Sequence, residues 1–232
     1  GIYANCVEDI DLVASVILSY NSDDLDMIQD YQYKRTVSLN KPIKFGFVRG
    51  PVWTFGDEDM KHGIEEFVKN AQLDIEELDL GKDFDDAAKA HEIIMNGSIA
   101  YSLMNYYQTD KSNLHPFTVK RIEAGIPVSA SDYVSAIEQA KKMEQILKQF
   151  FKKYDAIITP AAPGQAPRDL MNTGNAIFNG YWTMMGVPAI SLPFLKGKDD
   201  LPIGIQFIAN WSEDLKLLEI CKYILKKEKL AN

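Results

Sequence analysis

The sequence is poor in cysteine and has no long apolar run. Its two cysteines, Cys6 and Cys221, lie near opposite ends of the 232 residues, and neither a metal-ligand spacing nor a disulfide framework is present. We therefore expect a reducing, cytoplasmic location in which both cysteines act as small apolar residues in helices. No apolar run approaches the roughly 20 residues that a membrane span needs, so no membrane partner is expected.

Positive charge is also scarce. The 25 Lys and Arg residues face 33 Asp and Glu residues, which gives a formal net charge of −8. This acidic balance disfavours nucleic acid and anionic membrane surfaces as main partners. The hydrophobic share of 46% is ordinary for a soluble globular protein, and a chain of this length can bury a large core.

The sequence lacks the common catalytic motifs. Neither Ser-Ser-Gly-Gly nor Gly-x-Ser-x-Gly occurs, and no glycine loop of the phosphate-binding kind is present. The three histidines, His62, His91 and His115, are far apart and form no His-Glu-x-x-His motif. From the residues alone we therefore assign no catalytic residue, no metal ligand and no cofactor.

Local patterns in the first third of the chain predict a strand, a helix and a second strand. Residues 43–48 (IKFGFV) are typical of a strand, and Gly50-Pro51 ends it. The helix is expected to begin at Asp57, where carboxylates favour the N-terminal dipole. Residues 73–80 (LDIEELDL) alternate apolar and acidic residues, as a half-buried strand does. A strand, a helix and a strand in this order predict parallel pairing.

Capping residues predict where the other helices begin and end. Asn5, followed three residues later by Glu8, is a capping-box pattern for a first helix. The acidic stretch from Ser22 to Asp30 is expected to be a surface loop or a short helix. Four further helices are expected, over residues 84–107, from Pro116 to Gly125, from Ser129 to Tyr154 and after Ser212.

The stretch from Tyr154 to Ala209 organises the rest of the chain. Its first apolar run, residues 156–158, predicts a buried strand, and a loop rich in Pro, Gly and Ala follows. A short amphipathic segment over residues 178–185 comes next. The stretch ends in a predicted hairpin, with the turn residues 196–200 between two apolar runs, 188–194 and 203–209.

Three segments in this part of the chain carry a family resemblance, in the order DAIITPAAP, GNAIFNGYWTMMGVPAISLPF and LPIGIQFIANWSEDLKLLEICKYI. Together with GIYANCVEDIDLVASVIL at residues 1–18, they resemble the C-terminal half of the amidase-signature hydrolases. The resemblance implies an enzyme that hydrolyses carboxamide C–N bonds with a Ser/cis-Ser/Lys triad. It also implies that the Gly/Ser-rich nucleophile loop and the catalytic lysine lie upstream of this chain.

The patterns and the resemblance together predict the fold class. We expect one α/β unit over residues 1–232, with an amidase-signature-like mixed β-sheet that is flanked by helices and incomplete. A sheet cut from a larger one exposes strand edges and an apolar face. We therefore expect the chain to self-associate as a homo-oligomer or to need its missing N-terminal catalytic half.

The segment before the predicted hairpin is the best candidate for substrate contact. Asn179, Trp182 and Thr183 put polar and aromatic groups beside residues 186–188, where the chain enters a strand. The corresponding segment of the resembled family faces the substrate cleft, which adds weight to Trp182 and Thr183. Core packing explains Trp182 equally well, and it is favoured for Phe178 four residues earlier.

Two further candidates lie on other elements. Thr159, at the end of the strand that begins at residue 156, is expected to form a second part of the pocket wall. His91 is a weaker candidate. On an apolar helix stripe, a histidine is more often a hydrogen-bonded core or pocket residue than a metal ligand.

Two functions fit these features. In the first, the chain is the C-terminal portion of an amidase and forms the wall of a pocket for a small-molecule amide. In the second, it is a non-catalytic binding or scaffold module derived from the amidase fold. Which amide is cleaved stays open, because specificity depends on the shape of the whole pocket.

Overall fold

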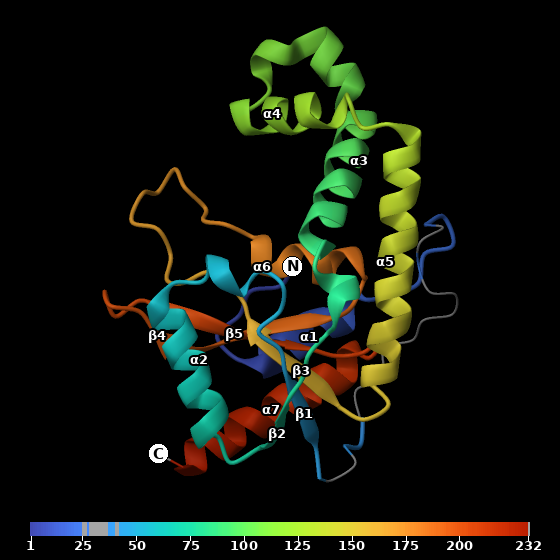
Figure 1. The fold of residues 1–232 in the computed structure, drawn as a ribbon. Coiled ribbons are helices and arrows are strands. Elements are labelled where there is room, and N and C mark those ends of the chain that lie inside the picture. The colour runs from blue at the N-terminus through green and yellow to red at the C-terminus, as the bar shows by residue number, and fades with distance from the viewer. Residues whose placement is uncertain (25–26, 28–36, 40–41, 232) are drawn as a thin grey trace.

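In the computed structural model, residues 1–24, 27, 37–39 and 42–231 are described. The strands are β1 (Lys44–Phe47), β2 (Asp74–Glu77), β3 (Ala156–Pro160), β4 (Ala189–Lys196) and β5 (Pro202–Ile208). They form one five-stranded sheet in the order β2–β1–β3–β5–β4, with helices around it (Figure 1). The predicted α/β class, with a sheet flanked by helices, is thereby confirmed.

β1 and β2 pair in parallel, as the sequence predicts. On its other side, β1 also pairs in parallel with β3. β3 lies in the middle of the sheet, and Ala156, Ile157 and Ile158 are fully buried. Burial on both faces explains their unbroken apolar run. β2 lies at an edge and is only partly buried, as its acidic alternation predicts.

The antiparallel part contains the predicted hairpin. β5 pairs with β3 and with β4, and both pairings are antiparallel, so the sheet is mixed. The turn between β4 and β5 is closed by a hydrogen bond of 2.9 Å from the Gly197 N–H to the Leu201 carbonyl. β4 is an edge strand, and Ala189, Ser191 and Pro193 on one of its faces are exposed. This face borders the candidate site.

The helices cover the sheet and extend beyond it. α3 and α5 run side by side away from the sheet, and α4 lies across their far end (Figure 1). α2 and α7 pack against β4, while α1 packs against α7. The α-helices of the described residues are α1 (Val7–Ile17), α2 (Glu58–Asn70), α3 (Ala87–Asp110), α4 (Pro116–Gly125), α5 (Ala130–Phe150), α6 (Ile177–Met184) and α7 (Asp214–Ala231).

Two predicted helix starts are each wrong by one residue. α1 begins at Val7 after the N-cap Cys6, whose side chain makes no capping bond, so Asn5 lies one residue too early for a capping box. α7 begins at Asp214, two residues after Ser212, which has a φ of 64°. Side-chain capping depends on the backbone angles before the first turn, and sequence spacing alone does not determine them.

Several other helix limits agree with the sequence, although α5 ends at Phe150, four residues before the predicted end at Tyr154. Ser129 caps α5, and its hydroxyl accepts a hydrogen bond of 3.0 Å from the Asp132 N–H. α4 begins at Pro116 and ends at Gly125, as predicted. Proline fits the first helical turn because its missing N–H would have had no partner there.

Three further predictions concern the start of α3, the two cysteines and the acidic stretch 22–30. α3 begins at Ala87 and not at residue 84, because residues 82–84 form a short 3₁₀ helix. Cys6 is exposed because it stands at the end of α1, outside the core, whereas Cys221 is buried as predicted. Most of the acidic stretch 22–30 lies outside the described residues.

Candidate substrate-pocket wall

A cavity of about 950 Å³, lined by both polar and apolar residues, lies beside the exposed face of β4. Ser191 of β4 and Gly204 of β5 line one side of it. The loop between β3 and α6 (residues 161–176, called the pocket loop below) lines most of the rest. Asn179 of α6 and Asp57, just before α2, also contribute. This space is called the main cavity below.

The main cavity offers hydrogen-bond donors and acceptors. Its lining includes four carboxamide, two carboxylate and two hydroxyl side chains, and none of these described lining residues is Lys or Arg. A neutral amide carries both donors and an acceptor, so it could be bound here from several sides. The polar lining residues are Gln165, Asn172, Asn175, Asn179, Asp57, Asp169, Thr173 and Ser191.

The short helix α6 carries three of the candidate residues. Trp182 is only 1% exposed, and the centroid of its ring lies 4.7 Å from the ring centroid of the buried Tyr181. Asn179 is half-buried and lines the main cavity. Thr183 is exposed and lies outside the lining of this cavity. Of the candidates on α6, Asn179 is therefore the one that the fold brings to the main cavity.

Thr159 lies in the centre of the sheet, two residues before the pocket loop. It is fully buried on β3, opposite Gln206 of β5. The Tyr181 hydroxyl lies near Thr159 and Trp182, and burial raises the pKa of this phenol, which is therefore protonated at neutral pH. Within the described residues, the polar side-chain atoms Thr159 Oγ1, Tyr181 OH, Trp182 Nε1 and Gln206 Oε1 are buried without a hydrogen-bond partner. Such atoms lower stability.

His91, on α3, lines a second cavity of about 350 Å³. Asn175 and Ala176 of the pocket loop line both cavities, so the two adjoin. Burial lowers the pKa of His91, Arg121 lowers it further by charge repulsion, and Glu92 opposes this shift. The imidazole is therefore neutral at pH 7 and can both donate and accept a hydrogen bond.

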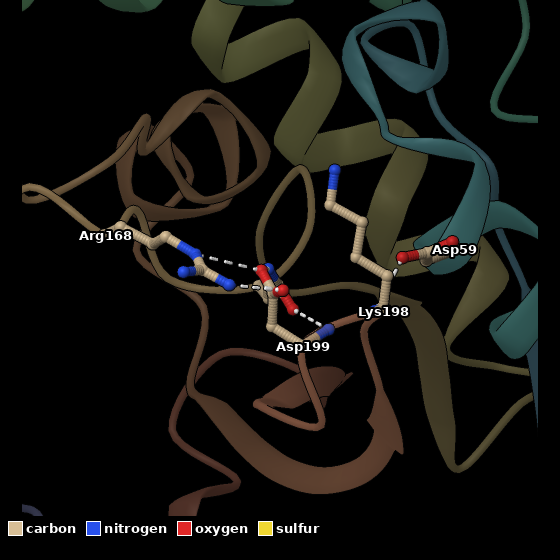
Figure 2. Close-up of polar contacts among 5 residues, drawn as sticks. Asp59, Arg168, Lys198 and Asp199 are labelled. Atoms are coloured by element: carbon tan, nitrogen blue, oxygen red, sulfur yellow. Dashed lines mark hydrogen bonds and ion pairs between the residues drawn. The ribbon is translucent and has the colours of Figure 1, made fainter.

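The turn between β4 and β5 contacts the first half of the pocket loop (Figure 2). Arg168 donates to the Asp199 carboxylate through Nη2 at 2.6 Å and through Nε at 3.3 Å. Gln165 Nε2 donates to the same carboxylate at 2.5 Å, and the Asp199 N–H donates to Gln165 Oε1 at 3.1 Å. Arg168 and Gln165 lower the pKa of Asp199, which is ionised at neutral pH. These three residues are called the turn–loop contact below.

Sequence reasoning missed several residues around the main cavity. Asp57 and Ser191 line it together with Asn179, although they lie on three separate elements. Asp199 reaches the pocket loop from a turn that is 31 residues from Arg168 in sequence. Each had a local explanation, Asp57 as a helix start and Asp199 as a turn residue, so no local signal pointed to the site.

The described residues meet the requirements of neither a metal site nor a membrane-spanning helix. Within the described ranges, no three His, Cys, Asp or Glu side chains are grouped so that they could hold a metal ion. The histidines lie on separate elements, with His62 on α2, His91 on α3 and His115 just before α4. No helix in this part of the chain combines the length and the apolar character needed to cross a membrane.

A family model and curated relatives match the chain. The model, described as Amidase, matches residues 1–218. A glutamyl-tRNA(Gln) amidotransferase subunit of Agathobacter rectalis is 27% identical over 256 residues, which cover 94% of this chain and 50% of the relative. The corresponding subunit of Aliarcobacter butzleri is 34% identical over 125 residues, which cover 49% of this chain and 28% of the relative. The chain thus spans half or less of the length of these relatives.

Solved structures share the fold. One described as a crystal structure of amidase has a TM-score of 0.81 at 15% identity, and the match covers 97% of this chain and 51% of that chain. A structure of fatty acid amide hydrolase has a TM-score of 0.76 at 15% identity, covering 97% of this chain and 47% of that one. The mixed sheet and its helices therefore correspond to about half of these larger folds. Because the family model matches nearly all of its residues, the chain belongs to the amidase family.

Proposed function

We propose that this chain is the C-terminal portion of an amidase, a hydrolase of carboxamide C–N bonds, and that it forms part of the substrate-pocket wall. The main cavity carries this proposal, because its carboxamide and hydroxyl side chains match the donors and the acceptor of a small-molecule amide. Asn179 is the side chain that we expect to bind the substrate directly. His91 would contact a part of the substrate that enters the adjoining cavity. Trp182 and Thr159 are buried, and they would hold the cavity wall in place without contacting the substrate. The exposed Thr183 would contact a substrate only where further protein encloses it.

The reactive groups are expected elsewhere in the protein. Amide hydrolysis needs an activated nucleophile, a base that takes its proton, and donors for the developing oxyanion. The sequence holds no loop rich in Gly and Ser that could carry these groups. We therefore infer that an N-terminal catalytic half, on the same polypeptide or a separate one, supplies them. The half-length matches to relatives and solved structures support a second part of similar size.

An exposed apolar stripe on α1 also supports a second part. Leu12, Val13, Val16 and Ile17 are spaced as on one side of this helix and are 42% to 74% exposed. The opposite side of α1 packs on α7. A helix that is apolar on two sides is typical of a protein interior, and a continuous exposed stripe marks an interaction surface. We infer that the catalytic half covers this stripe.

The stripe makes a prediction about the isolated chain. Without the catalytic half, the chain should self-associate, and the double variant Leu12→Asn with Val16→Asn should reduce the mass seen by light scattering. Tyr101→Asn is the matched control, because Tyr101 is 89% exposed on α3, away from α1. A wild-type chain that stays monomeric and binds no hydrophobic dye would contradict an uncovered interface.

Substrate binding is tested by titrating the 232-residue chain with benzamide and following the side-chain amide of Asn179 by NMR. We expect this signal to shift, and Asn179→Ala to weaken benzamide binding by roughly 3- to 10-fold, the size of one hydrogen bond. Asn113→Ala is the control, because Asn113 lies in the exposed helical segment after α3. Benzoate should bind more weakly, since the described lining has no cation. Benzamide shifts confined to residues outside the main cavity would contradict the proposal.

A further inference from the structure

We propose that Asp199, in the turn between β4 and β5, is a positioning residue that fixes the first half of the pocket loop, and with it one wall of the main cavity. The proposal rests on the proposed function only in treating that cavity as the substrate site. Asp199 itself is not among the residues that line the main cavity. Its effect therefore acts through Gln165, which does line the cavity, and through Arg168.

Both carboxylate oxygens of Asp199 are engaged. Oδ1 accepts from Arg168 Nη2 at 2.6 Å, while Oδ2 accepts from Gln165 Nε2 at 2.5 Å and from Arg168 Nε at 3.3 Å. Gln165 in turn accepts the Asp199 N–H. The Asp199 side chain is 25% exposed, whereas that of Arg168 is 79% exposed. The bonds to Gln165 are therefore the better shielded from solvent, and the ion pair with Arg168 is open to screening by salt. The segment that carries Gln165 and Arg168 is therefore held in one place relative to the turn.

The start of α2 ties the turn and the loop to the same point. The Lys198 N–H donates to Asp59 Oδ2 at 2.8 Å (Figure 2). The Asp57 N–H donates to the carbonyl of Pro163, in the pocket loop, at 2.7 Å. Together with the turn–loop contact, these bonds connect the turn, the pocket loop and the start of α2 to one another in pairs. A connected network of this kind restricts a loop more than an isolated surface ion pair does.

Two glycines allow these segments to lie close together. A Cβ at Gly197 in the turn would collide with Gln165 Oε1, and a Cβ at Gly164 in the loop would collide with the carboxylate of Asp57. A side chain at Gly197 would displace the Gln165 carboxamide, and one at Gly164 would displace the Asp57 carboxylate. Glycine at both positions therefore leaves room for the contacts between the turn, the loop and the start of α2.

The second half of the pocket loop is held in a different way. Among residues 169–175, the side chains of Asp169 and Asn172 accept hydrogen bonds from backbone N–H groups two residues later, each at 2.9 Å. These bonds stay within the loop. The segment up to Arg168 is thus held by contacts with distant elements, and the segment after it by local turns. Asp199 contacts the loop at the boundary between the two.

Hydrogen–deuterium exchange of the full 232-residue chain tests this proposal. Asp199→Asn keeps the shape of the side chain but removes its charge, so the Asp57 amide, which donates to the Pro163 carbonyl in the loop, should exchange roughly tenfold faster, as expected for a local opening. The amides of β5 should keep their wild-type rates. Asp200→Asn is the matched control, because Asp200 lies in the same turn but pairs with Lys196 at 2.7 Å. Asp199→Glu keeps the carboxylate and should restore part of the protection.

Two results would overturn the positioning role. One is unchanged exchange of the Asp57 amide in Asp199→Asn. The other is equal acceleration in β5, because Asp199 would then hold only the hairpin. A benzamide titration of the same variants separates this inference from the proposed function. If Asp199→Asn binds benzamide more weakly at an unchanged Tm, both the positioning role and the amide site are supported. If the Asp57 amide exchanges faster in this variant while benzamide binding is unchanged, the positioning role is supported and the amide site is contradicted.

Discussion

The two sides of α6 differ in what they contact, although their residues alternate in the sequence. On the inner side, Phe178, Tyr181 and Trp182 are buried in the core. On the outer side, Asn179 lines the main cavity and Thr183 is exposed. The 3.6-residue period of the helix sends residues i, i+3 and i+4 to one side. On this helix, the large aromatic side chains pack in the core, whereas the carboxamide of Asn179 contributes to the wall of the main cavity.

Alanine substitutions on the two sides give the largest expected contrast. Trp182→Ala should lower the free energy of unfolding by about 3–5 kcal/mol, because it removes a large side chain from the core. Asn179→Ala should change it by less than about 1 kcal/mol. Urea denaturation of both variants measures the difference. Equal losses would break the distinction between a packing side and a cavity side.

Gly180 tests how tightly the inner side of α6 packs against α3. A Cβ at Gly180 would lie 2.6 Å from His91 Nδ1, so Gly180→Ala should destabilise the protein by about 1–3 kcal/mol through overpacking. Adding His91→Ala removes the ring and should recover most of that loss. Thermal unfolding of the single and double variants gives the coupling. A stabilised Gly180→Ala variant would mean that α3 and α6 are not tightly packed here.

Thr159 should give a smaller effect of the opposite sign. Its hydroxyl is buried without a partner among the described residues, so Thr159→Val removes an unsatisfied polar group. The free energy of unfolding should rise by about 1 kcal/mol. Chemical denaturation checks this value. A clear loss of stability would indicate that the hydroxyl is hydrogen-bonded in solution.

The smallest expected effect is a pH dependence from His91. Because the pKa of His91 is lowered in the folded protein, the unfolded chain takes up this proton more readily. The neutral imidazole therefore contributes stability above the unfolded pKa, and this contribution is lost as the pH falls below about 6.5 through the folded pKa. His91→Gln should flatten the fall in unfolding free energy. A slope equal to that of the wild-type chain would contradict the assignment to His91.

Local patterns predicted the strands better than the helix starts. β1, β3 and the β4–β5 hairpin follow from apolar runs and turn residues, because strand period and turn chemistry are local properties. The starts of α1 and α7 depended on backbone angles at Cys6 and Ser212, which the packing of the surrounding chain determines.

The candidate site was predictable only in part. Asn179 follows from its position before the hairpin, and it lines the main cavity. Asp57, Ser191 and Asp199 could not be foreseen, because each has a sufficient local role as helix start, edge-strand residue or turn residue. Their proximity to the pocket loop arises only when β4, β5 and the start of α2 are brought together.

The central claim is that this chain forms a pocket wall while the reactive groups lie in another part of the protein. It is tested most directly by measuring ammonia release from benzamide in the same purified 232-residue sample that is used for the NMR titration. The account predicts that benzamide shifts the Asn179 signal and that no ammonia is released. Ammonia release that persists after every other amidase has been excluded by mass spectrometry would contradict it.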